Sequence, residues 1–126
     1  MNKTNLFLDD IRMPDDVFRY TSDPIYNRKD WVIVRNYDEF VEEITKNGLP
    51  ELISYDHDLA DEHYDPRMGN HAEYSKLVFK EKTGYDCAKY IVEYCMDGNH
   101  PAPEFKCHSM NPSGKQNILT LLEIFK

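Results

Sequence analysis

The sequence has no apolar run long enough to cross a bilayer and no cysteine pair at C-x-x-C spacing. A membrane-spanning helix needs about 20 consecutive apolar residues, so we expect no membrane association. Residues 1–8 also lack the longer apolar run and small-residue cleavage site of a secretory signal. The cysteines, Cys87, Cys95 and Cys107, are odd in number, which indicates buried, reduced thiols in a cytoplasmic protein rather than a disulfide framework.

Positive charge is also scarce, because 15 Lys and Arg face 23 Asp and Glu, for a net charge of −8. Binding along a nucleic-acid duplex depends on clustered Lys and Arg, so we expect no duplex partner. A nucleotide or other small phosphorylated ligand, a metal ion or a protein partner remains compatible with this charge. With 40% apolar residues in a chain of 126, residues 1–126 are expected to form one globular domain.

Short apolar runs alternate along the chain with segments of helical periodicity. The runs typical of buried strands are residues 5–8, 31–34, 52–55 and 104–108. Apolar positions at helical spacing predict three main helices. These helices begin after Asn36, at Gly84 and at Pro112, and they end before Gly48, at Gly98 and at Phe125.

Two long inserts follow the first and third predicted strands. Residues 15–30 are polar and show no helical stripe, so we predict an irregular connection there. Residues 60–82 are also polar, and such a long insert is usually a functional loop or lid. Within it, residues 72–80 have the composition of a short helix, and His63 and His71 are candidate lid residues.

Alternating strands and helices predict an α/β fold with a parallel sheet and helices on its faces. Right-handed crossovers then favour the strand order 2-1-3-4, which makes the first and third strands neighbours. Ligands of open α/β sheets bind outside the carboxyl ends of the strands at this switch point.

Polar side chains follow three of the predicted strands at the point where each strand ends. They are Asp9, Asp10 and Arg12 after the first strand, Asp56, His57 and Asp58 after the third, and His108, Ser109 and Asn111 after the fourth. Because parallel strands end at a common edge, we expect these residues to form one site.

Three of these carboxylates, on Asp9, Asp10 and Asp56, are hard oxygen ligands suited to Mg²⁺ or Mn²⁺. Brought close together, they would repel one another strongly without a cation. We therefore predict a divalent metal site, and the alternative is that these residues are helix caps and solvated loop charges.

Candidate catalytic residues are His57, His108 and Asp56. Imidazole titrates near neutral pH, so one histidine can take a proton from water while the other protonates a leaving oxygen. That exchange is what opening of a cyclic phosphodiester requires. Alternatively, each histidine is a structural residue whose hydrogen bonds are satisfied.

Candidate substrate-binding residues are Arg12, Asp58, Ser109 and Asn111. Arginine binds phosphate through two parallel hydrogen bonds, and the start of the last helix offers backbone amides to phosphate oxygens. Alternatively, Arg12 forms an ion pair with the nearby Asp15 or Asp16, and Asn111 or Ser113 only caps the helix.

These strand-end residues resemble those of receiver domains of two-component signalling, in which the matching positions bind Mg²⁺, accept phosphate and sense it. The resemblance implies a receiver-like (flavodoxin-like) fold. The sequence departs from receivers because we expect a loop over residues 14–30 in place of the first helix, and because the fifth strand, with its lysine, and the fifth helix are absent. These departures disfavour a phospho-relay.

The sequence is more similar to cyclic-phosphate-processing receiver domains. The matching motifs are Leu6-Phe7-Leu8-Asp9-Asp10-Ile11-Arg12-x-Pro14, Trp31-x-x-x-Arg35, Ile53-Ser54-Tyr55-Asp56-His57-Asp58-Leu59, Thr83-Gly84-Tyr85-Asp86 and His108-Ser109-x-Asn111-Pro112-x-Gly114. This resemblance implies processing of cyclic nucleotides or RNA ends at the strand-end residues. Ala60 stands where the family pattern has Gly, and the insert over 61–82 is long.

Three functions follow from these observations. The first is a metal-dependent or His-assisted phosphoesterase that acts on a cyclic nucleotide or a 2′,3′-cyclic RNA end. The second is a non-catalytic module that binds a phosphorylated ligand or a protein partner. The third is a degenerate receiver that serves only as an interaction scaffold.

Overall fold

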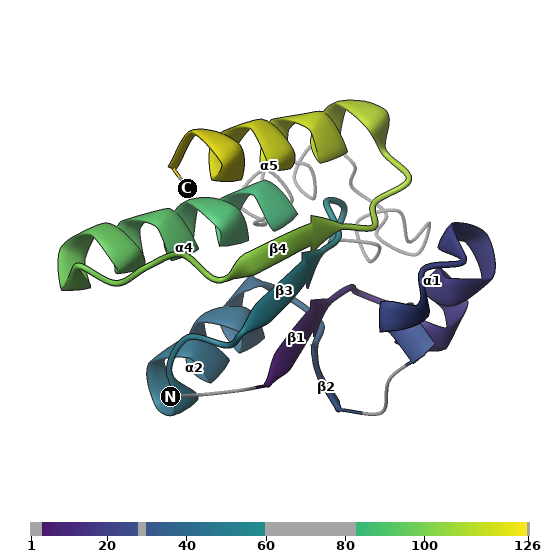
Figure 1. The fold of residues 1–126 in the computed structure, drawn as a ribbon, viewed down its shortest axis with the longest axis horizontal. Helices are drawn as coiled ribbons and strands as arrows, with labels where there is room; N and C mark the ends of the chain where they lie inside the picture. Colours follow the sequence, from purple (N-terminus) through teal and green to yellow (C-terminus); the bar gives the residue numbers. More distant parts are fainter. Residues whose placement is uncertain (1–3, 28–29, 60–82, 126) are drawn as a thin grey trace, which may run out of the picture.

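A computed structural model describes residues 4–27, 30–59 and 83–125 (Figure 1). The helix expected at 72–80 and the candidate lid residues His63 and His71 lie outside the described residues.

The sheet has four parallel strands in the order β2-β1-β3-β4, which confirms the predicted order. The strands are β1 (Asn5–Leu8), β2 (Trp31–Val34), β3 (Leu52–Tyr55) and β4 (Glu104–Cys107). Three of the four have the predicted bounds, and β4 ends one residue earlier than predicted.

The strands also end level with one another. Leu8 at the end of β1 is paired with Val34 of β2 and Tyr55 of β3, and Tyr55 is paired with Cys107 of β4. Because the paired strands end level, the residues that follow β1, β3 and β4 lie beside one another. This register brings the strand-end residues to one edge of the sheet.

Within the described part of the chain, four α-helices and one 3₁₀ turn connect and flank the strands. They are α1 (Pro14–Thr21), η1 (Pro24–Asn27), α2 (Tyr37–Asn47), α4 (Gly84–Gly98) and α5 (Pro112–Phe125). The last three are the predicted helices.

The prediction of an irregular connection over residues 15–30 was wrong, because α1 and η1 occupy most of it. Pro14 is at the first helical position, where its fixed φ suits a helix. The Asp16 carboxylate accepts a hydrogen bond from the backbone N–H of Met13 at 2.9 Å and so caps the helix. In this short helix only Pro14 and Val17 are buried, so the sequence shows no apolar stripe.

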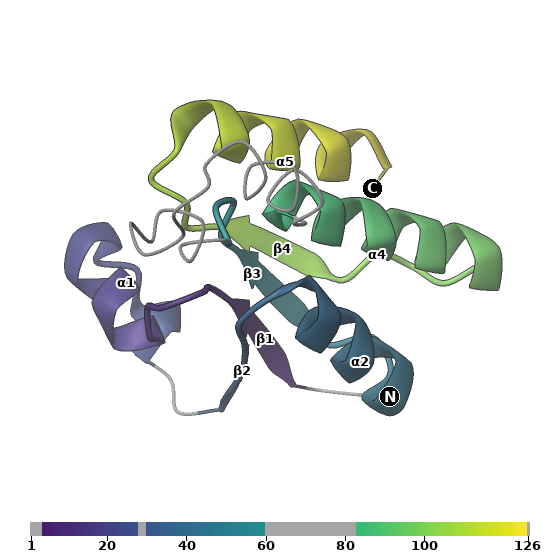
Figure 2. The same ribbon diagram turned by 180° about the vertical axis from the view of Figure 1, so that it is seen from behind.

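The two faces of the sheet carry cores of different size. The larger core joins α2, α4 and α5 to apolar side chains of the strands, including Leu6, Leu8, Ile53 and Tyr55. The smaller core consists of Phe7, Val17 and Tyr26, with Trp31 and Ile33 beside it, and it lies under α1 and η1. Figures 1 and 2 show α1 apart from α4 and α5.

The cysteines and the apolar character of the helices were the subject of two predictions from composition. All three cysteines are free and buried, as predicted. Among the described residues, no helix has the length and apolar character needed to cross a membrane.

Candidate functional site

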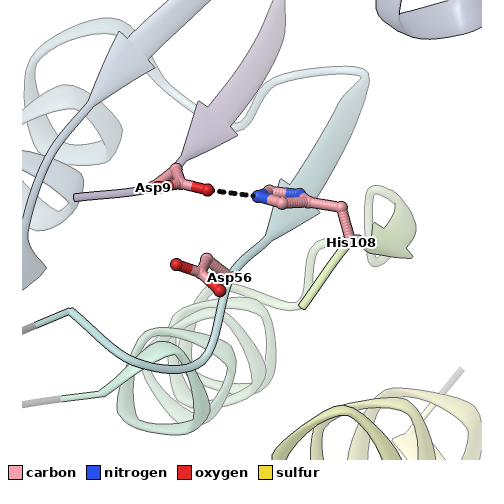
Figure 3. Close-up of side chains that lie close together, drawn as sticks. All are labelled: Asp9, Asp56 and His108. Carbon is pink, nitrogen blue, oxygen red and sulfur yellow. Dashed lines mark hydrogen bonds and ion pairs between the residues drawn. The ribbon is translucent and has the colours of Figure 1, made fainter. Parts of the chain in front are cut away.

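The residues that directly follow β1, β3 and β4 meet at the carboxyl edge of the sheet. They are Asp9, Asp56 and His108, which are 0%, 4% and 2% exposed. One ligand atom from each lies within 4.8 Å of the other two, and Figure 3 shows the three side chains converging. The edge predicted from the topology therefore brings a carboxylate pair and an imidazole together.

Asp9 is surrounded by hydrogen-bond donors. Its Oδ1 accepts the backbone N–H groups of Ile11 at 3.0 Å and Arg12 at 2.9 Å. Its Oδ2 lies 3.0 Å from Nε2 of His108 and 3.6 Å from the Arg12 guanidinium. Burial would raise the pKa of Asp9, but the hydrogen bonds from His108 and from these two amides lower it to about 2. Asp9 is therefore ionised at neutral pH.

At Asp56, the effects that raise the pKa outweigh those that lower it. Burial, reinforced by the charges of Asp9 and Asp10, raises the pKa of Asp56 to about 7, against the hydrogen bond from the His57 backbone N–H and the charge of Arg12. That N–H donates to Oδ1 of Asp56 at 2.8 Å. Asp56 therefore titrates near neutral pH, chiefly because it is buried with few hydrogen-bond donors around it.

An open pocket of about 430 Å³ adjoins these carboxylates. Its lining residues are Asp10, Ile11, Arg12, Asp56, Asp58, Ser109, Met110 and Asn111. A larger pocket, of about 490 Å³, lies around residues 100–105 at the amino end of β4, at the opposite end of the strands. The chemistry-bearing residues gather at the smaller pocket, so we take that one as the site.

Arg12 reaches into this pocket from the loop after β1. Besides the contact with Asp9, its guanidinium lies 3.4 Å from Sδ of Met110 and 5.6 Å from the centre of the Tyr20 ring. The aspartate that it faces is Asp9, whereas Asp16, one of the alternative partners considered from sequence, pairs with Arg19 at 3.1 Å. The Arg12 side chain is 32% exposed, so it is accessible to a ligand.

Asp58 and Asn111 line the pocket, and the His57 ring lies against both of them. Nδ1 of His57 lies 2.9 Å from Oδ1 of Asp58, and Nδ2 of Asn111 lies 3.4 Å from both Asp58 oxygens. Oδ1 of Asn111 accepts the backbone N–H of Gly114 at 3.0 Å, so Asn111 does cap α5. Ser109 accepts the backbone N–H of Asn111 through its Oγ at 3.0 Å.

The two candidate histidines occupy different environments. The His57 side chain is 19% exposed, whereas the His108 side chain is 0% exposed. Burial lowers the pKa of His108, although its hydrogen bond to Asp9 opposes the shift. The acid–base role predicted for the pair stays a prediction, but the enclosed ring of His108 cannot touch a ligand in this conformation.

Sequence reasoning missed two residues that position the site: Ser54, which contacts His108, and Arg35, which contacts the loop after β1. The buried Ser54 hydroxyl lies 2.7 Å from Nδ1 of His108 and 2.6 Å from the Tyr26 hydroxyl. Arg35 donates to the backbone carbonyls of Asp9 at 3.1 Å and Arg12 at 2.7 Å, which fixes the loop after β1. A lone serine in an otherwise apolar strand was the available signal for Ser54.

Two glycines allow helices to approach the site closely. A Cβ on Gly84, at the start of α4, would lie 1.6 Å from the carbonyl oxygen of Asp56, and a Cβ on Gly114 would lie 2.3 Å from the His57 ring. The backbone N–H of Gly84 also donates to the His57 carbonyl at 2.8 Å. Both helix starts are thus set against the end of β3.

A parallel sheet in the order 2-1-3-4 with an acidic cluster at its carboxyl edge defines a receiver-like α/β domain. Residues 4–124 match the model of the family described as Cyclic-phosphate processing Receiver domain. The chain therefore belongs to this family, as its motifs indicated, and the family description links it to cyclic-phosphate processing. Searches of curated proteins and of solved structures found no match.

Proposed function

We propose that this domain is a phosphoesterase that opens a cyclic phosphate, carried by a nucleotide or by a 2′,3′-cyclic RNA end. The observation that carries the proposal is the pocket itself, in which Arg12 lies beside the carboxylates of Asp10 and Asp56. Carboxylates that could hold a cation and a guanidinium that could bind phosphate, at one pocket, would suit an anionic phosphodiester.

The donor set fits a divalent cation. Mg²⁺ and Mn²⁺ prefer carboxylate oxygens, and burial together with the charges of Asp9 and Asp10 raises the pKa of Asp56, a shift that a bound cation would oppose. These three residues would hold the ion, which would polarise the phosphoryl oxygens when bound.

The remaining residues would bind the substrate and move protons. Arg12 would donate two hydrogen bonds to the phosphate. His57, next to Asp58 and Asn111, would exchange a proton with the attacking water or the leaving oxygen. Because the His108 ring is enclosed, we assign it to the support of Asp9 rather than to this exchange.

The direct test is turnover of 2′,3′-cyclic and 3′,5′-cyclic mononucleotides and of cyclic dinucleotides, with Mg²⁺, Mn²⁺ or EDTA. We expect ring-opened monophosphates in the presence of a metal. Arg12→Ala is expected to lower kcat/KM by about 10- to 100-fold, because a hydrogen bond to a charged group contributes about 1.5–3 kcal/mol. Product formation is measured by chromatography.

Arg19→Ala is the matched control, since Arg19 is an exposed arginine that pairs with Asp16 on α1, and it should retain full activity. Ligand binding without product would favour the non-catalytic binding module instead. A folded protein that shows no binding and no product would contradict the proposal. It would favour the third function, an interaction scaffold.

A further inference from the structure

A chain of buried hydrogen bonds runs from η1 to the carboxyl edge of the sheet. The Tyr26 hydroxyl lies 2.6 Å from Oγ of Ser54, which lies 2.7 Å from Nδ1 of His108, and Nε2 of His108 lies 3.0 Å from Oδ2 of Asp9. These four residues are 2%, 0%, 2% and 0% exposed, in that order. We infer that Ser54 and Tyr26 are positioning residues, which hold His108 in the tautomer that donates to Asp9 and thereby fix the Asp9 carboxylate beside Asp56.

The direction of every hydrogen bond in the chain follows from its acidic end. An ionised carboxylate only accepts hydrogen bonds, so the His108 proton facing Asp9 must be on Nε2. In a neutral imidazole the other nitrogen then accepts, so Ser54 donates to Nδ1. The Ser54 oxygen can in turn accept from the Tyr26 hydroxyl.

The opposite tautomer would be unfavourable at both ends. With the proton on Nδ1, lone pairs of Nε2 and of Oδ2 of Asp9 would face each other at 3.0 Å. Ser54 would also have to turn its proton toward Tyr26, whose own proton would then need another acceptor. A buried polar group that loses its partner is unfavourable, so the hydroxyls bias the ring toward one tautomer.

Aromatic packing leaves the His108 ring little other freedom. Phe7 stacks on it with ring centres 4.6 Å apart and planes 5° apart, and Tyr26 meets it edge-on at 6.0 Å. On the backbone side, the Tyr20 hydroxyl donates to the His108 carbonyl at 2.6 Å. The plane of the ring is thus set by packing, and Asp9 and the hydroxyls together favour the tautomer with the proton on Nε2.

The role of these residues in catalysis rests on the proposed function, because it is Asp9 that would hold the metal. Outer residues that orient a ligand typically change metal affinity or activity by 10–100-fold when they are removed. Ser54→Ala should therefore weaken Mn²⁺ binding by about tenfold or more, although Ser54 contacts neither the pocket nor the ion.

The test is ¹⁵N NMR of the His108 ring at pH 8 in EDTA, with Mn²⁺ binding measured separately by water-proton relaxation. The wild type should show protonated Nε2 and unprotonated Nδ1, and Ser54→Ala should show a mixture of tautomers. Tyr26→Phe removes only the outer hydroxyl and opens no large cavity, so it should shift the tautomers less than Ser54→Ala. Thr45→Ala, which deletes an exposed hydroxyl on α2, should change neither readout.

Protonated Nδ1 in the wild type would overturn the inference, as would an unchanged tautomer in Ser54→Ala. If Ser54→Ala does not fold, the His108 tautomer is measured in Tyr26→Phe instead. A tautomer unchanged from the wild type in that variant would overturn the inference. The tautomer is read without metal or substrate, so a wild type with the expected tautomer but no turnover would count against the proposed function and in favour of the positioning role.

Discussion

At the residue scale, Asp9 and Asp56 show how hydrogen-bond donors decide the charge of a buried carboxylate. Both are almost fully buried, and burial alone raises the pKa of a carboxyl group. Asp9 faces two backbone amides and the His108 ring, whereas Asp56 accepts the His57 amide and adjoins the charge of Asp9. One site thus contains a carboxylate that is firmly ionised and another that titrates near neutral pH.

This difference predicts the pH dependence of stability for Asp56→Asn. The pKa of Asp56 is about 7 in the folded state, against 3.8 ordinarily, so the folded protein binds this proton more tightly than the unfolded chain. Its contribution to stability is greatest below pH 4 and falls as pH rises toward 7. Without metal, Asp56→Asn should therefore be more stable than wild type at pH 8, by about 1–4 kcal/mol.

Urea denaturation in EDTA across pH 4 to 8 measures this effect. The advantage of the variant should shrink toward pH 4, because Asp56 is then protonated in the folded wild type and partly protonated in its unfolded chain. A difference between wild type and variant that does not change with pH would show that the Asp56 pKa is not raised.

At the element scale, the approach of α5 to the end of β3 depends on the absence of a side chain at residue 114. Gly114→Ala should favour the helix by about 1 kcal/mol from propensity alone, but the new Cβ would lie 2.3 Å from the His57 ring. We expect the ring to move and turnover to fall at least tenfold, with little gain in stability.

Gly98→Ala is the matched control for this substitution. Its Cβ would meet only the His100 ring, and that residue is exposed and distant from the site, so activity should be unchanged. Turnover and the His57 ring signals in NMR are the measurements. A fully active Gly114→Ala whose His57 signals have shifted would contradict the proposed role of His57.

The helices and strands differ in how well the sequence alone predicts them. The strand runs and the stripes of α2, α4 and α5 were predictable because each buries a regular apolar pattern. Once the strands end level, the meeting of Asp9, Asp56 and His108 follows from topology. In contrast, α1 is too short to show a stripe, and η1 lies in a segment predicted to be irregular. The partnership of Tyr26 with Ser54 could therefore not be predicted, because it requires the position of η1.

At the scale of the whole molecule, the sheet is covered unequally. Helices α2, α4 and α5 cover one face, whereas α1 and η1 cover the other. On that second face, Lys106 of β4 pairs with Asp23, just before η1, at 3.0 Å. The buried chain from Tyr26 to Asp9 lies in this thinner layer, so the geometry of the site depends on the smaller core.

We hold that the carboxylates at the sheet edge form a divalent cation site, and calorimetric titration with Mn²⁺ at pH 8 measures this binding. We predict one binding site in the wild type and in Asp97→Asn, which alters an exposed carboxylate on α4, and at least tenfold weaker binding in Asp56→Asn. Equal Mn²⁺ affinity in all three proteins, or no binding by the wild type, would contradict the claim.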